Sequence, residues 1–313
     1  MDAQFIDLNG RSFYLRSWGK PDLPPLLMLH GFPEYGEAWR DLAPYLCDRF
    51  HCLAPDQRGY GQSWCPEGTE NYTLSKLVSD MATIAQRFKT PLNVLGHDWG
   101  ASVAYGLAMF RPDLVSRLVI ANGVHPVPFQ RAMAAGGAQS EASQYINAFR
   151  KPDAAAHFSA NNFAKLEVFF RHGMGVDWLS ESRMRAYRTE WARPGRLEAM
   201  LNWYRASPLV VAKPGVPRTD LPDLPAERLM VRCPHLLLWG PEDKALLPEA
   251  TAGLEVFAPD LTRIYIPDTD HWLHHQKTQA VADAILSWIS NGRPDPSSGP
   301  KYPGEREGLA PRP

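Results

Sequence analysis

The segment LNVLGHDWGASVAYGLAMF (residues 92–110) constrains the fold more than any other part of this chain. An apolar run typical of a buried strand leads into Gly96-His97-Asp98-Trp99-Gly100, and a run of helix-forming residues follows at once. Small residues on both sides of a central polar residue are typical of the sharp strand-to-helix turn written G-x-S-x-G, which lifts the central side chain above a sheet. The central residue here is an aspartate, so the pattern predicts a carboxylate at the carboxyl end of a strand in a parallel sheet.

The rest of the chain alternates strand and helix patterns. The first nineteen residues predict a hairpin that turns at Asn9-Gly10. Five further apolar runs predict strands, in PPLLMLHG, FHCLAPD, SRLVIANG, PHLLLWG and LTRIYIPD, and helical patterns lie between them, including residues 73–88 with Thr73 as a possible N-cap. Apolar strands separated by helices predict an α/β protein with a mostly parallel eight-stranded sheet that is covered by helices on both faces.

A helix-prone block interrupts this alternation. Residues 125–228 contain no β-rich run; they are aromatic and basic, and they end in the proline-punctuated stretch KPGVPRTDLPDLPAERL. We therefore expect a helical cap domain over 125–228, inserted into a core domain made of 1–124 and 229–290. The tail 291–313 is rich in Pro, Gly and charged residues and lacks core formers, so we expect it to be flexible.

Composition narrows the possible partners. The 33 Lys and Arg residues nearly balance the 34 Asp and Glu residues, and no basic run stands out, which argues against nucleic acid or an anionic membrane as partner. No segment reaches the ~18 consecutive apolar residues of a membrane span, and the first residues lack the pattern of a secretory signal, so we expect a cytoplasmic protein. The four cysteines match no paired zinc spacing and are expected to be thiols.

Several motifs together resemble a known family. His30-Gly31-Phe32-Pro33-Glu34 comes first, DQRGYGQS (residues 56–63) follows, then the turn at Asp98, and finally a late Asp and His. In this order and spacing they resemble the α/β-hydrolase superfamily and, within it, the epoxide hydrolases. The resemblance extends from the first hairpin to about residue 290, and it implies the α/β-hydrolase fold with an inserted cap.

The aspartate in the turn determines the expected chemistry. An isolated aspartate there could be a helix N-cap, but at the head of a parallel sheet it faces the usual ligand site of α/β proteins. A carboxylate can displace a leaving group from an sp³ carbon and form an alkyl-ester intermediate. Hydrolysis of that ester needs a base, and the superfamily order of nucleophile, acid and histidine implies Asp98, Asp243 and His271.

Some of these residues have close competitors. Glu242 neighbours Asp243, and His274 and His275 follow His271, where we expect them at the start of a helical segment.

For the oxyanion, the resemblance points to the backbone N–H groups of Phe32 and Trp99. Trp99 lies at the expected helix start, where N–H groups are free, and Phe32 precedes Pro33, which has no N–H of its own.

The cap supplies the expected acid. Opening an epoxide generates an alkoxide, and a phenol is acidic enough to protonate it while staying neutral at pH 7. Tyr145 in QYINAF and Tyr204 in LNWYR match positions of the family, with Tyr187 as a further candidate.

The sequence is compatible with three functions. The leading hypothesis is an epoxide hydrolase that needs no cofactor or metal and acts on a small apolar epoxide and water, as a monomer or homodimer. The second is a haloalkane or haloacid dehalogenase with the same Asp98 nucleophile, in which the Trp99 indole would bind the departing halide. The third is a non-catalytic binding protein of this fold, which the apparently complete set of residues disfavours.

Overall fold

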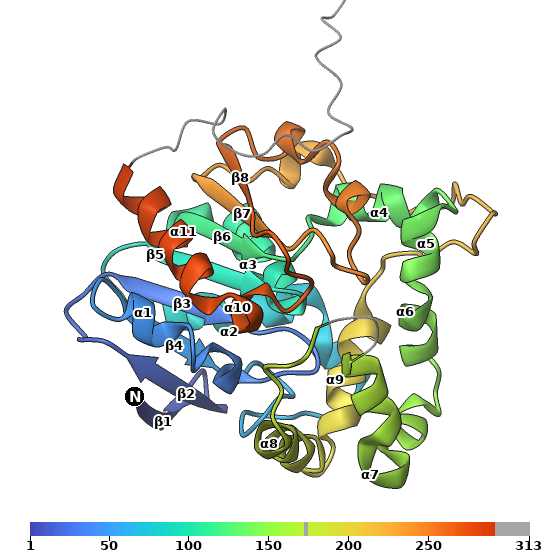
Figure 1. Ribbon diagram of the computed structural model, residues 1–313, viewed down its shortest axis with the longest axis horizontal. Coiled ribbons are helices and arrows are strands. Elements are labelled where there is room, and N and C mark those ends of the chain that lie inside the picture. Colours follow the sequence, from blue (N-terminus) through green and yellow to red (C-terminus); the bar gives the residue numbers. More distant parts are fainter. Residues whose placement is uncertain (172–174, 292–313) are drawn as a thin grey trace, which may run out of the picture.

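A computed structural model describes residues 1–171 and 175–291 of the protein. Its centre is one eight-stranded sheet with the strand order β1-β2-β4-β3-β5-β6-β7-β8 (Figure 1). All neighbouring strands from β4 to β8 pair in parallel. At the other edge, β2 is antiparallel to both of its neighbours, β1 and β4. The mostly parallel sheet expected from the sequence is confirmed. The strands are β1 (Asp2–Asp7), β2 (Ser12–Trp18), β3 (Pro25–Leu29), β4 (His51–Pro55), β5 (Leu92–His97), β6 (Val115–Ala121), β7 (His235–Trp239) and β8 (Leu261–Tyr265).

The helices fall into two groups. The first group packs against the sheet: α1 (Ala43–Leu46), α2 (Leu74–Ala85), α3 (Trp99–Phe110), α10 (Leu273–Gln276) and α11 (Thr278–Asn291). The second group lies between β6 and β7 in the chain: α4 (Pro126–Ala134), α5 (Ala138–Ala142), α6 (Gln144–Phe149), α7 (Ala154–Arg171), α8 (Glu181–Trp191) and α9 (Arg196–Ala206). Helix α7 is interrupted by non-helical backbone at residues 160–163.

Short-range sequence signals explain several of these elements. Asn9 and Gly10 both have positive φ angles, and Leu8 and Arg11 exchange backbone hydrogen bonds across them, so the predicted Asn-Gly hairpin is present. Thr73 does precede α2, but its hydroxyl contacts Ser75 Oγ at 3.2 Å and caps no backbone N–H. Thr73 therefore occupies the predicted N-cap position with an extended backbone, but its side chain does not cap the helix.

Alternate residues of the buried strands fill two separate cores. Leu26 and Met28 of β3 pack on one face of the sheet with side chains of α1 and α11. Leu27 and Leu29 point to the opposite face, where α2 and α3 cover them. This alternation follows from the two-residue period of a strand, and it requires apolar residues at every position, as the sequence has them.

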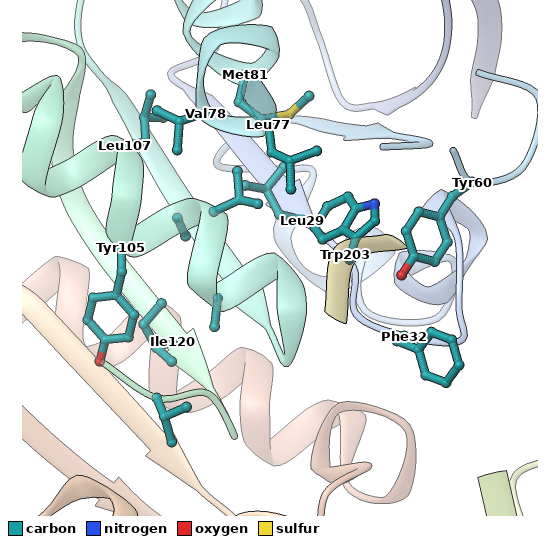
Figure 2. Close-up of a cluster of buried hydrophobic side chains, with 14 of the residues drawn as sticks. Leu29, Phe32, Tyr60, Leu77, Val78, Met81, Tyr105, Leu107, Ile120 and Trp203 are labelled. Atoms are coloured by element: carbon teal, nitrogen blue, oxygen red, sulfur yellow. The ribbon is translucent and has the colours of Figure 1, made fainter. Parts of the chain in front are cut away.

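The helices between β6 and β7 gather at one side of the sheet (Figure 1). Their contact with the rest of the protein is partly apolar: Trp203 of α9 is buried beside Tyr60, with ring centroids 5.3 Å apart, and lies close to the α2 side chain Leu77 in Figure 2. It is also partly polar, as in the hydrogen bond from Arg183 of α8 to Asp41. Within the described residues, no helix is long and apolar enough to cross a membrane. The tail expected to be flexible lies, from residue 292 onward, outside the described residues.

Candidate active site

The candidate site residues of the core lie just beyond the carboxyl ends of strands. Phe32 follows β3, Asp98 follows β5, Asp243 follows β7 and His271 follows β8. Because these strands are parallel, their carboxyl ends lie at the same edge of the sheet. The topology therefore brings together four side chains that are far apart in sequence, at the edge where α/β proteins bind their ligands.

Asp98 occupies a strained turn between β5 and α3. Its backbone has φ 50° and ψ −120°, a conformation that L-residues rarely adopt and that lifts the side chain away from the sheet. Two neighbouring glycines make the turn possible. A Cβ on Gly100 would lie 2.1 Å from the carbonyl oxygen of Leu29, and a Cβ on Gly31 would lie 2.4 Å from the Asp98 Cβ. The glycines of both motifs are thus explained by close packing around one aspartate.

The two oxygens of Asp98 have different surroundings. Oδ1 accepts a hydrogen bond from the backbone N–H of Phe32 at 2.8 Å. Oδ2 faces the His271 ring, with His271 Nε2 at 3.7 Å. Burial raises the pKa of Asp98, while His271 and the backbone N–H groups of Phe32 and Trp99 act in the opposite direction. Of the two N–H groups named as oxyanion donors, that of Phe32 thus binds this carboxylate, and that of Trp99 acts to lower the pKa of Asp98.

His271 forms a close pair with Asp243. Its Nδ1 atom lies 2.8 Å from Asp243 Oδ2, and both side chains are buried. Burial alone would lower the pKa of His271, but the carboxylates of Asp243 and Asp98 outweigh it and raise the pKa to about 9. Asp243 thus orients the ring so that Nε2 points toward Asp98.

Asp243 is itself held by a residue that sequence reasoning missed. The Asn122 side chain donates to Asp243 Oδ2 at 2.6 Å and accepts from the backbone N–H of Gly240 at 2.7 Å. The N–H groups of Ala245 and Leu246 bind the other oxygen of Asp243 at 2.8 and 2.9 Å. Asn122 has a φ of 36°, and an asparagine followed by Gly123 at the end of a buried strand was the available signal for such a backbone.

The competing residues lie elsewhere. Glu242 is exposed, whereas its neighbour Asp243 points inward to His271. His274 and His275 lie in α10, as expected, and both approach Glu34 rather than Asp98. Tyr187 also turns to Glu34, since its hydroxyl donates to Glu34 Oε1 at 2.6 Å.

A cavity of about 200 Å³ opens above Asp98. It is lined mainly by apolar side chains from α2, α3, α4, α6 and α9, and Tyr145 and Tyr204 contribute to the same lining as Asp98. The two tyrosine rings have their centroids 6.2 Å apart. Burial raises the pKa of both phenols, and the Asp98 carboxylate raises them further, so both are protonated at neutral pH. The structure thus brings two phenol donors and one carboxylate to a single apolar cavity.

Comparison with known proteins identifies the family. The sequence profile of the alpha/beta hydrolase fold matches residues 24–278. The chain belongs to the α/β-hydrolase superfamily. It is 31% identical over 292 residues to the AB hydrolase superfamily protein YfhM of Bacillus subtilis (strain 168), covering 92% of this chain and 98% of that one. It is also 30% identical over 287 residues to epoxide hydrolase 2 of Caenorhabditis elegans, covering 89% of this chain and 77% of that one.

Solved structures agree with this placement among the α/β-hydrolases. One structure, described as a novel epoxide hydrolase from metagenomes of hot environments, has a TM-score of 0.82 and 32% identity and covers 92% of this chain and 98% of that one. A Bacillus megaterium epoxide hydrolase solved with an inhibitor has a TM-score of 0.80 and 26% identity, covering 92% of this chain and all of that one. The protein is thus a member of the epoxide hydrolase family, and the fold, family and enzyme class expected from the sequence are confirmed.

One further residue joins the turn at Asp98 to the loop that carries His271. His97, directly before Asp98, is fully buried, and its Nε2 contacts the backbone carbonyl oxygen of His271 at 2.8 Å. A carbonyl oxygen can only accept, so this ring nitrogen carries the proton. His97 therefore supports the loop that carries His271, and it is not itself one of the residues that line the cavity.

Proposed function

We propose that this protein hydrolyses an epoxide to a vicinal diol through an ester on Asp98. The proposal is supported most by one observation: Asp98, Tyr145 and Tyr204 line the same apolar cavity. An apolar lining favours an apolar substrate, and the three polar groups supply a nucleophile at one side of the substrate and acids at the other. Tyr145 and Tyr204 both come from the helices between β6 and β7, which we assign to a cap domain over 125–228.

In the first step, an oxygen of Asp98 attacks one epoxide carbon. The C–Asp98 ester bond forms as the C–O bond of the strained ring breaks, and the electron pair of that bond moves to the departing oxygen. Tyr145 and Tyr204 hydrogen-bond this oxygen, and one of them transfers its proton. Oδ2 is suited to attack, because the N–H of Phe32 already binds Oδ1.

In the second step, water hydrolyses the ester. The ester removes the Asp98 charge that helps to raise the pKa of His271, and the neutral imidazole takes a proton from a water molecule. The hydroxide then attacks the carbonyl carbon of the ester. The N–H groups of Phe32 and Trp99 stabilise the negative oxygen of the tetrahedral intermediate. The intermediate then expels the diol oxygen, which receives a proton from His271. The proton left on the Asp98 carboxyl group returns to the tyrosinate, and this restores both the Asp98 carboxylate and the phenol.

A substrate panel tests this function. Aryl, aliphatic and bulky trans-epoxides are incubated with the protein beside haloalkanes and fluoroacetate, and diol and free halide are measured. Diol formation that an Asp98→Asn variant lacks supports the proposal. Halide release without diol would indicate the dehalogenase alternative, in which the Trp99 indole binds the halide. Neither product from any substrate would point to a non-catalytic member of the fold.

Further expectations from the sequence belong to this proposal. The chemistry as written needs only side chains, backbone N–H groups and water, so we assign the reaction no cofactor. A cytoplasmic location and a monomeric or homodimeric state stay predictions, which cell fractionation and analytical ultracentrifugation would test.

A further inference from the structure

A second cluster of polar side chains lies behind His271 and is not used in the proposed reaction. Glu34, His274 and His275 approach one another there, and their side chains are 0%, 0% and 2% exposed. Glu34 belongs to the loop after β3, and the two histidines are consecutive residues of α10. Consecutive helical side chains normally diverge, yet these two rings have their centroids 4.1 Å apart and both approach one carboxylate.

The distances in this cluster suit a metal ion. Glu34 Oε1 lies 2.8 Å from His275 Nε2, and Glu34 Oε2 lies 3.5 Å from His274 Nε2. One ligand atom from each of the three residues falls within 4.8 Å of the others. Ligand bonds of about 2.0–2.2 Å in a tetrahedral site separate neighbouring donor atoms by about 3.3 Å. The separations of 2.8 and 3.5 Å between Glu34 and the two imidazoles lie on either side of this value.

The charge of the cluster also favours a cation. Buried charges in proteins are paired or coordinate metals. Among the described residues, the ion pairs of Glu34 within 4.0 Å are all with imidazoles, those of His97, His274 and His275. Two atoms that face each other, Glu34 Oε2 and His274 Nε2, are buried and have no hydrogen-bond partner. A cation between them would satisfy both.

A second layer of contacts holds the ligands in place. The Tyr187 hydroxyl donates to Glu34 Oε1 at 2.6 Å. The Trp178 ring stacks on His275 with centroids 3.8 Å apart and an interplanar angle of 11°. A hydrogen bond to a ligating carboxylate orients that carboxylate, and the stacked indole fixes the plane of the His275 ring. They also join the cluster to the segment between β6 and β7.

We propose that Glu34, His274 and His275 bind one divalent transition-metal ion of the Zn²⁺ type. Two imidazoles and a carboxylate are ligands that suit Zn²⁺ and Co²⁺ and are poor for Mg²⁺ or Ca²⁺. The ion ties the loop that carries the Phe32 N–H to the helix that follows His271, so its role is structural. This proposed site departs from the sequence-based expectation of no metal. The proposal does not depend on the proposed epoxide hydrolase function.

Metal binding to the full chain tests the site directly. The protein is treated with a chelator, exchanged into metal-free buffer and titrated with Co²⁺, and then Zn²⁺ is added. We expect about one Co²⁺ per chain, with visible d–d absorption typical of four- or five-coordinate cobalt, and loss of that absorption when Zn²⁺ displaces it. X-ray absorption of the zinc form should report two imidazoles and carboxylate oxygen as ligands. The thermal midpoint should rise with Zn²⁺ concentration, because a ligand that binds the folded state stabilises it.

Variants identify the residues. His274→Gln and His275→Gln should each lower bound metal to below a tenth of an equivalent and abolish the Zn²⁺-dependent rise of the thermal midpoint. The control His157→Gln removes an exposed imidazole of α7 and should bind metal as the wild type does.

Two results would overturn the proposal. One is a wild-type protein that takes up no stoichiometric Co²⁺ or Zn²⁺. The other is a zinc X-ray absorption spectrum without two imidazole ligands, which decides the question even where a variant fails to fold.

Discussion

The Nε2 atom of His271 lies 3.7 Å from Oδ2 of Asp98, a separation too long for a hydrogen bond. Its other ring nitrogen, Nδ1, is held by Asp243 at 2.8 Å. A water molecule between Nε2 and the aspartate would be close to both the base and the carbonyl carbon of an ester. This spacing suits a histidine that activates water, and it leaves an oxygen of Asp98 available to attack carbon.

The first prediction concerns that attack. In a single turnover in ¹⁸O-water, the diol should contain unlabelled oxygen and the Asp98 carboxylate should acquire label, because water attacks the ester carbonyl. Mass spectrometry of the diol and of the peptide containing Asp98 measures both. Label in the first-turnover diol would instead show that water opens the ring directly.

Replacing the base should stop the reaction at the ester. In His271→Gln, Asp98 can still attack, but water is no longer activated, so a protein species heavier by the mass of the epoxide should accumulate. Intact-protein mass spectrometry detects it, and steady-state turnover should fall by at least ~10⁴-fold. The control His51→Gln removes an imidazole of β4 outside the cavity and should turn over normally. Absence of the adduct with a substrate that the wild type converts well would count against His271 as the base.

The two cavity tyrosines should act on one oxygen. Tyr145→Phe and Tyr204→Phe each remove a hydroxyl and little volume, so each should slow ester formation by less than the ~10²–10⁴-fold typical of general acid catalysis, since one phenol partly replaces the other. The double variant should lose far more than the product of the two single losses. Stopped-flow measurement of the alkylation rate tests this.

A control separates this effect from loss of a buried hydroxyl. Tyr105→Phe removes the phenol that contacts His235 at 3.3 Å, outside the cavity, and should leave alkylation unchanged. If the double variant opens epoxides at nearly the wild-type rate, both tyrosines serve in packing and not as acids.

The ionisation of His271 should appear in the pH dependence of stability. Its pKa is about 9 in the folded protein and ordinarily about 6.5, so below pH 6.5 its stabilising contribution is fully present. As the pH rises from 6.5 through 9, the unfolded chain loses this proton before the folded protein does, and the contribution is lost. The free energy of unfolding should therefore fall by up to about 1.4 kcal/mol per pH unit relative to His271→Gln. Denaturant titrations at several pH values measure it, and parallel curves would refute the raised pKa.

The tight turn around Asp98 predicts a contrast between two glycines. In Gly100→Ala the new Cβ would meet the Leu29 carbonyl at 2.1 Å, so we expect a loss of more than about 2 kcal/mol in the free energy of unfolding, or no folded protein. Gly137→Ala is the control, because its φ is −89° and no atom lies within 4 Å of the new Cβ. We expect that variant to stay within about 0.5 kcal/mol of the wild type by chemical denaturation. Equal effects of the two changes would contradict the packing described for the turn.

Local sequence patterns were sufficient to predict the fold and the family. Strand periodicity, the Asn9-Gly10 turn and the Gly-x-Asp-x-Gly motif depend on contacts between near neighbours in the chain, and each of them appears in the structure at the expected place. The resemblance to the α/β-hydrolases implied Asp98, Asp243 and His271 from their order in the chain, and the parallel strands bring these three positions to one edge of the sheet.

Tertiary structure alone decided which polar side chains face one another. Residues close in sequence, such as Glu242 and Asp243, or His271 and His274, have side chains that point in different directions. Where each side chain points depends on how distant elements pack. The same holds for Asn122, which meets Asp243 across 121 positions, and for Tyr187, which meets Glu34 across 153. No local pattern encodes such contacts, because they form only when separate strands and helices have packed around a common core.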